Sequence, residues 1–142
     1  MNLSADETTV TYHDPCRLGR QMGVYDEPRE LINAVDGVNL VEMEHSGEDA
    51  MCCGVSSMMS CNENARSLRV SRMEEIRATG ADTMITSCPK CVTHFECLKF
   101  EGDEKYADIE ILDVVSFLAR QVEAKKAEAV STTVEIQNPI EA

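Results

Sequence analysis

The chain alternates short stretches of β-branched or apolar residues with longer segments in which apolar residues recur every three or four positions. The short stretches are residues 8–12, 38–43, 82–86 and 108–112. They predict strands, because β-branched and aromatic side chains favour a pleated, half-buried surface. The first strand must end before Pro15, because proline cannot donate the hydrogen bond that a continuing strand needs.

A helix is predicted after each of these strands. The first begins at Asp26 and ends at Gly37, and the second covers about residues 62–80. The third begins at Pro89, which suits the first helical position, and Asp113 caps the fourth. Four successive strand–helix units predict an α/β fold, namely a small three-layer domain with about four parallel strands, right-handed crossovers and helices on both faces.

The length of 142 residues suits one domain, and no apolar run approaches the roughly 20 residues that cross a bilayer. We expect residues 1–7 to be a leader, residues 8–123 to form a single domain and residues 124–142 to be a tail. Apolar residues lose their helical recurrence after Ala124. We therefore expect the tail to be disordered alone or to dock on a partner.

Charge and cysteine content narrow the class of protein. Thirteen basic and 26 acidic side chains give a net charge of −13, which argues against binding to a nucleic-acid backbone. The chain has seven cysteines and no tryptophan. An odd and modest number of cysteines fits poorly with a disulfide framework. We expect reduced thiols in the cytoplasm, used for metal or redox chemistry, with attachment to the membrane only through partners.

Five cysteines follow the predicted strands closely. Cys16 lies after the first strand, the adjacent Cys52 and Cys53 lie after the second, and Cys88 and Cys91 lie after the third. Since the carboxyl ends of parallel strands meet at one edge of a sheet, these five thiols should converge there. Two further cysteines do not fit the pattern and favour roles as small buried apolar residues; they are Cys61 and Cys97.

The spacing of these thiols indicates a metal centre, because thiolates are soft ligands for iron–sulfur clusters and zinc. Cys88 and Cys91 open a predicted helix, whose N-terminus stabilises negative sulfur. The adjacent Cys52 and Cys53 can hold an extended cluster from a loop, and Gly54 lets the backbone approach and offer an N–H to sulfur. A four-thiolate zinc site and a thioredoxin-like dithiol at Cys88 and Cys91 are the alternatives.

The motif Tyr-His-Asp-Pro-Cys-Arg-Leu-Gly-Arg at residues 12–20, with the spacing of the five cysteines, resembles the cysteine-rich CCG domain of the heterodisulfide reductase family. The resemblance covers roughly residues 8–122 and is closest to the second CCG repeat of the membrane-linked type. Members usually carry two repeats, whereas this chain has one, and no ferredoxin-like Cys-x2-Cys-x2-Cys-x3-Cys run is present. We therefore expect a C-terminal domain of a longer subunit or a separately encoded half.

The resemblance implies a cofactor and a reaction. In the family these five cysteines hold a noncubane [4Fe–4S] cluster, which implies reduction of a disulfide by one-electron steps. The disulfide is a small molecule or part of a carrier protein, and the implied partners are redox subunits with ferredoxin-like [4Fe–4S] clusters and, as a further candidate, a membrane cytochrome b subunit. The alternative is an electron-relay module, or a structural zinc domain, of an anaerobic glycerol-3-phosphate, glycolate or lactate dehydrogenase complex.

Besides Cys52 and Cys53, two polar side chains are candidate catalytic residues. His13 could orient a cluster sulfide or give a proton to a departing thiolate, or it could only hydrogen-bond its turn. Lys90 could hold a substrate anion or neutralise cluster charge, or it could be solvated, and the same alternatives apply to Arg17 and Arg20. His45 is expected in a solvated loop and His94 in helix-surface packing.

Overall fold

Four parallel strands form a sheet in the order β2-β1-β3-β4 in the computed structural model, which describes residues 8–55, 62–102 and 104–137. Side chains are described as far as residue 127. All neighbouring strands pair in parallel, so the predicted α/β class is confirmed. The strands are β1 (Thr8–His13), β2 (Val38–Val41), β3 (Thr83–Thr86) and β4 (Glu110–Asp113).

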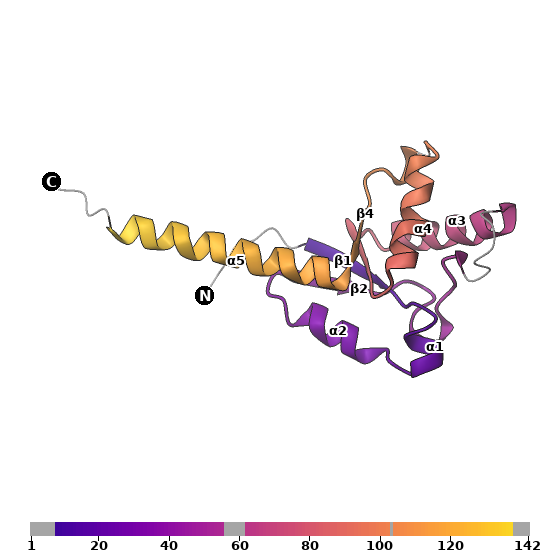
Figure 1. Ribbon diagram of the computed structural model, residues 1–142, viewed down its shortest axis with the longest axis horizontal. Coiled ribbons are helices and arrows are strands. Elements are labelled where there is room, and N and C mark those ends of the chain that lie inside the picture. Colours follow the sequence, from indigo (N-terminus) through magenta and orange to yellow (C-terminus); the bar gives the residue numbers. More distant parts are fainter. Residues whose placement is uncertain (1–7, 56–61, 103, 138–142) are drawn as a thin grey trace.

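Helices cover both faces of the sheet and complete the three layers (Figure 1). One face packs on α2 and α5 through a cluster that includes Tyr12, Ile32 and Phe117. The other packs on α3 and α4 through a cluster that includes Met73 and Phe95. The helices are α1 (Gly19–Met22), α2 (Asp26–Asn33), α3 (Glu63–Ala78), α4 (Pro89–Phe100) and α5 (Val114–Gln137).

The alternation of side chains along β1 decides which layer each residue faces. Val10 and Tyr12 belong to the apolar cluster under α2 and α5. Successive side chains on a strand point to opposite faces, so His13 is directed toward α3 and α4. Its ring meets the ring of Phe95 edge-on, with the ring centroids 5.0 Å apart.

The carboxyl ends of the strands lie side by side, as the sequence predicts. His13 at the end of β1 is in register with Thr86 at the end of β3, which is in register with Asp113 of β4. The Asp113 carboxylate then accepts hydrogen bonds from the N–H groups of Val115 and Ser116, both at 3.0 Å. This confirms the predicted cap of the last helix.

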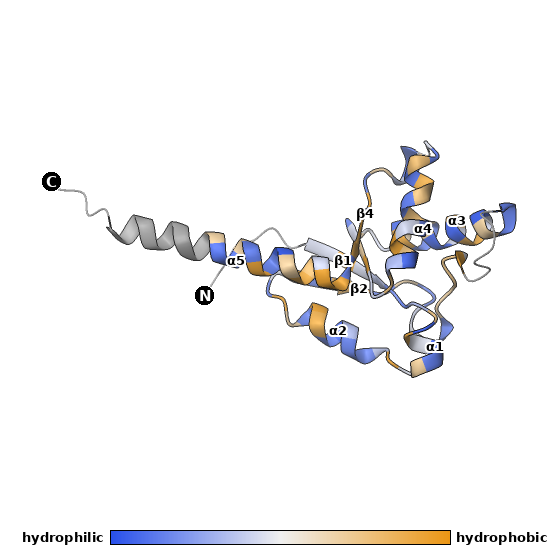
Figure 2. Cartoon of the chain, in the orientation of Figure 1, coloured by the Kyte–Doolittle hydropathy of each residue, from blue (hydrophilic) through white to orange (hydrophobic). Residues whose placement is uncertain are grey.

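Residues 124–137, within the predicted tail, continue α5 to Gln137; that the tail is disordered alone or docks on a partner stays a prediction. Residues 124–129 are alanine, lysine and glutamate, and their high helix propensity favours continuation of the helix there. Figure 1 shows α5 running away from the sheet, and Figure 2 shows apolar positions on the part of α5 beside the sheet. Within the described residues no helix, α5 included, is both long and apolar enough to span a membrane.

The distal part of α5 should add little to the stability of the domain. Its side chains are exposed over residues 123–127 apart from an ion pair of Lys125 Nζ with Asp36 Oδ2 at 3.0 Å, and exposed pairs contribute about 0–1 kcal/mol. Truncation after Ala124 should therefore change the free energy of unfolding by less than about 1 kcal/mol, measured by urea denaturation.

Phe117→Ala is the matched control on the same helix. Phe117 is buried against the sheet, and its truncation should cost about 3–5 kcal/mol. A loss of several kcal/mol on truncation after Ala124 would instead show that the tail docks on the domain.

Candidate metal centre

Three loops at the carboxyl edge of the sheet enclose a cavity of about 160 Å³. Four of the five predicted cysteines line it, and they come from the loop after β1, the connection after β2 and the start of α4. The convergence that the parallel topology predicts is therefore present. The lining residues are Pro15, Cys16, Arg17, Gln21, Cys53, Val55, Cys88, Lys90 and Cys91.

Cys53 and Cys91 form the buried side of this cavity. Each is only 3% exposed, and their Sγ atoms are 3.3 Å apart. A hydrogen bond with Cys52 lowers the pKa of Cys53, but the bond to Cys91 and burial outweigh it and raise the pKa to about 12. Without a metal, Cys53 is therefore a protonated thiol, and metal binding has to displace its proton.

The fifth predicted ligand, Cys52, is half-buried beside Cys53. Its Sγ accepts a hydrogen bond from the Gly54 N–H at 3.3 Å, as the sequence predicts for this glycine. Cys52 also packs against the apolar cluster that contains Cys53 and Cys91. The structure thus brings all five cysteines to one edge, with four of them on the cavity wall.

His13 lies beside the two buried sulfurs. One of its ring nitrogens and the Sγ atoms of Cys53 and Cys91 all lie within 4.8 Å of one another. Burial, reinforced by the charge of Arg72, lowers the pKa of His13 to about 3, so the ring is neutral. Its Nδ1 accepts a hydrogen bond from Arg72 Nε at 3.2 Å.

A buried carboxylate holds the loop that carries Cys16. Asp14 accepts two hydrogen bonds from Arg29 of α2, both at 2.8 Å, and a third from the Gly47 N–H at 2.8 Å. Arg29 also binds Glu42 after β2. This network joins the loops after β1 and β2, so the position of Cys16 is fixed relative to the segment that leads to Cys52.

Arg72 and Arg29 are functional neighbours that the sequence prediction missed. Arg72 of α3 is fully buried and forms an ion pair with Glu75. The signal was present in the helix pattern, because Arg69 and Arg72 interrupt the apolar face that continues to Ile76. Arg29 gave no such signal, because charged residues are common on a solvent-facing helix.

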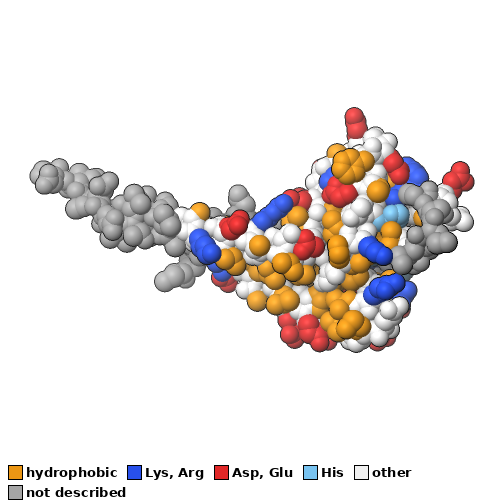
Figure 3. Space-filling view, viewed as in Figure 1, with side chains coloured by type: hydrophobic (Ala, Val, Ile, Leu, Met, Phe, Trp, Pro, Cys, Tyr) orange, Lys and Arg blue, Asp and Glu red, His pale blue; other side chains and the backbone are white. Residues whose placement is uncertain are grey.

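The predicted basic side chains do not all face the cavity. Arg17 and Lys90 line it, whereas Arg20 Nη2 donates to the Ala50 carbonyl at 2.6 Å and so braces α1 against the loop before Cys52. The half-exposed His45 holds Glu75 through Nδ1 at 2.6 Å. Figure 3 shows basic side chains around an apolar area at the end of the molecule away from the long helix.

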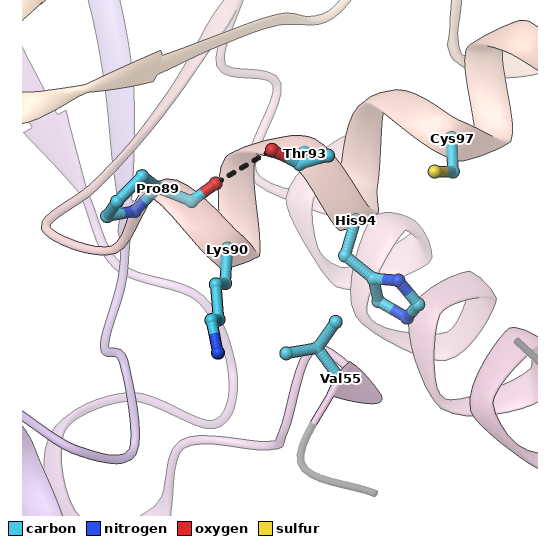
Figure 4. A pocket seen from close by; sticks show the side chains of 6 residues that line it. All are labelled: Val55, Pro89, Lys90, Thr93, His94 and Cys97. Carbon is cyan, nitrogen blue, oxygen red and sulfur yellow. Dashed lines mark hydrogen bonds between the residues drawn. The ribbon is translucent and has the colours of Figure 1, made fainter. Parts of the chain in front are cut away.

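A second hollow of about 320 Å³ adjoins the cysteine cavity and shares Val55 and Lys90 with it. Figure 4 shows the Lys90 and His94 side chains projecting from α4 toward the segment that carries Val55. His94 is buried rather than at the helix surface, and Arg69 Nη1 contacts its Nδ1 at 3.2 Å. Cys97 is half-buried on the wall of this hollow.

The six cysteines that the structure describes are free thiols, and the seventh, Cys61, lies outside the described residues. Four sulfur donors on one cavity wall, with Cys52 beside Cys53, suit an iron–sulfur cluster or zinc, both of which favour thiolate ligands. Cys91 of α4 contacts Cys53, which lies in the connection after β2, so the sulfur set extends beyond a Cys88–Cys91 dithiol. The donor set therefore fits a metal centre.

Comparisons with known proteins agree with this geometry. The family model described as a cysteine-rich CCG domain matches residues 10–96. The chain is 39% identical over 121 residues to the probable iron–sulfur-binding oxidoreductase FadF of Bacillus subtilis, covering 80% of this chain and 16% of that protein. It is 37% identical over 116 residues to one subunit of the dihydromethanophenazine:CoB–CoM heterodisulfide reductase of Methanosarcina acetivorans, covering 80% and 28%.

A third relative carries a different activity in its name. One subunit of the CoM/CoB fumarate reductase of Methanothermobacter marburgensis is 38% identical over 112 residues, covering 77% of this chain and 22% of that protein. The chain thus spans less than a third of the length of each of these relatives.

Gly54 should be sensitive to any added side chain. Its φ is +89°, and a Cβ there would lie 2.4 Å from the Ala65 carbonyl oxygen and 3.2 Å from His94 Nε2. Gly54→Ala should therefore cost about 2–4 kcal/mol in the free energy of unfolding of the metal-free chain, through backbone strain and overpacking.

Gly80→Ala separates the cost of backbone strain from the cost of overpacking. Gly80 has a φ of +72° but no atom within 4 Å of an added Cβ, so only the backbone term of about 1–2 kcal/mol applies. Equal losses in urea denaturation for the two variants would contradict the close packing of Gly54 on α3.

Proposed function

The chain belongs to the CCG family of cysteine-rich domains, and from that premise we propose that it is an iron–sulfur redox domain that holds one noncubane [4Fe–4S] cluster. The observation that carries the proposal is the convergence of thiols from three separate loops on one cavity. The names of two relatives, an iron–sulfur-binding oxidoreductase and a component of a heterodisulfide reductase, support it. The proposed ligands are Cys16, Cys52, Cys53, Cys88 and Cys91.

The proposed reaction is reduction of a disulfide. The substrate accepts two electrons and two protons, its S–S bond breaks, and two thiols form. When bound, the cluster would supply one-electron chemistry and an iron that can hold sulfur, as is usual for a cofactor that carries the redox step. The protein would hold the cluster through its cysteines, Cys52 and Cys53 among them. Its charged side chains would set the electrostatic potential at the site.

Lys90 and Arg17 are the residues proposed to meet the substrate. Both line the cysteine cavity, and Lys90 also lines the adjoining hollow. A cation at this place favours a thiolate or another anionic group of the substrate, and it offsets negative charge on the thiolate ligands. His13 lies on the buried side, next to Cys53 and Cys91. It is proposed to orient a cluster sulfide or to give a proton to a departing thiolate.

An electron-relay role is the second candidate, and the range of relatives favours it. They include a protein named as part of a fumarate reductase, so the domain occurs in proteins named for different reactions. In that role the chain would pass electrons within a dehydrogenase complex, and Lys90 and Arg17 would not meet a substrate. A structural zinc domain is the corresponding redox-inactive alternative.

The names of two relatives as enzyme subunits support proposed partners. Electrons would come from redox subunits with ferredoxin-like [4Fe–4S] clusters, with a membrane cytochrome b protein as a further partner. The substrate would be a small disulfide or a carrier-protein disulfide. We also propose that the protein is cytoplasmic and is attached to the membrane only through its partners.

Ligation can be tested by replacing single cysteines. Cys53→Ala removes one sulfur of the most buried pair and should abolish cluster loading, whereas Cys97→Ala, on the wall of the adjoining hollow, should leave it intact. The measurement is iron, acid-labile sulfide and zinc content after anaerobic purification, with EPR after oxidation in the presence of thiol. Equal losses from both variants would contradict the ligand assignment, and zinc without iron would favour the structural role.

Variants of Lys90 and Arg17 distinguish disulfide reduction from an electron-relay role. Lys90→Gln and Arg17→Gln should keep the iron content but weaken the thiol-induced EPR signal or disulfide turnover, by about tenfold for the loss of one charge-assisted contact. Lys126→Gln, an exposed position on α5, is the control for net charge. Unchanged signal and turnover in both site variants, with the cluster intact, would favour the relay role.

A further inference from the structure

Arg72 places a permanent positive charge in the layer between α3 and the sheet. Its side chain is fully buried, which is unusual for arginine unless the group is paired. It donates from Nε to His13 Nδ1 at 3.2 Å and from Nη1 to the His45 carbonyl at 2.6 Å, and it forms an ion pair with Glu75. These contacts fix the guanidinium against the ring of His13.

The contact with Arg72 decides where the proton of the His13 ring lies. A guanidinium has only donors, so Nδ1 must be the acceptor and carries no proton. A neutral ring has one N–H, which must then be on Nε2. The edge-on contact with Phe95 further limits rotation of the ring.

The same contact restricts what His13 can do beside the sulfurs. Nδ1 is engaged by Arg72, so Nε2 is the ring nitrogen left for the site that contains Cys53 and Cys91. A protonated Nε2 cannot bind a metal, but it can donate a hydrogen bond to a thiolate or sulfide. The grouping of His13, Cys53 and Cys91 therefore consists of one donor and two sulfurs rather than three metal ligands.

We propose that Arg72 is a positioning residue that holds His13 as a hydrogen-bond donor to the sulfur set and supplies a buried positive charge to it. The part that concerns the cluster rests on the proposed function. Among the described residues, the buried Arg72 Nη2 has no hydrogen-bond partner. A buried donor without a partner is rare, and the proposed positive charge of Arg72 leaves this N–H available to an anionic group.

The tautomer of His13 is the first test, and it needs no metal. In the reduced, metal-free full chain, long-range proton–nitrogen correlation NMR should show His13 protonated on Nε2 and unprotonated on Nδ1. Arg72→Met should give a mixture of tautomers, and Glu75→Gln, which keeps the donor to His13, should retain the Nε2–H form. A wild-type ring protonated on Nδ1 would overturn the proposal directly.

The reduction potential of the loaded protein is the second test. Arg72→Met should keep its iron content but disfavour reduction about tenfold, a shift of about 59 mV to more negative potential for one electron, because the reduced centre is more negative. Arg72→Lys, which keeps a cation, should restore part of the shift. A purely structural Arg72 would lower stability in all variants without moving the tautomer or the potential.

The outcomes separate this proposal from the proposed function. An unchanged tautomer in Arg72→Met, or an unchanged potential at full iron content, would overturn the role of Arg72. A wild-type protein that takes up no iron would overturn the cluster assignment, while the tautomer measurement would still decide the role of Arg72 at His13. If Arg72→Met does not fold, the role of Arg72 is decided by the His13 tautomer of the wild-type protein and by the reduction potential of Arg72→Lys.

Discussion

The carboxylate of Asp14 is the single group on which the geometry of the sulfur edge most depends. It is almost fully buried and accepts two hydrogen bonds from Arg29 and one from the Gly47 N–H. A buried carboxylate is tolerated only when it is paired and hydrogen-bonded, and removing one partner leaves an uncompensated charge. Asp14 therefore ties the end of β1, helix α2 and the loop after β2 into one arrangement.

Arg72 plays the corresponding part on the opposite face of the sheet. Asp14 follows His13 directly in the chain, so the last residue of β1 and the residue after it anchor in different layers, His13 through Arg72 and Asp14 through Arg29. Both contacts are charge-assisted and directional. The loop that carries Cys16 thus begins at residues that are anchored on both faces of the sheet. Because of this anchoring, the cysteine ligands can be positioned before a metal binds.

The order of the elements could be predicted because its determinants are local. Strand and helix patterns at residues 8–13, 83–86 and 89–100 follow from residue type and spacing, and parallel topology then brings Cys16, Cys53 and Cys88 to one edge. The end of α5 at Gln137 could not be predicted from apolar recurrence, because the alanine, lysine and glutamate residues at 124–129 favour a helix through propensity without such a recurrence.

The sequence by itself determined the fold class, the family and the convergence of five thiols, because each depends on local patterns and on the rule that parallel strands end together. Only the tertiary structure decided which polar groups meet. Arg72 lies 59 residues from His13 and Arg20 lies 30 residues from Ala50, and nothing in the local pattern selects such partners. Burial makes these pairings obligatory, since a buried charge or donor must find a partner wherever the folded chain provides one.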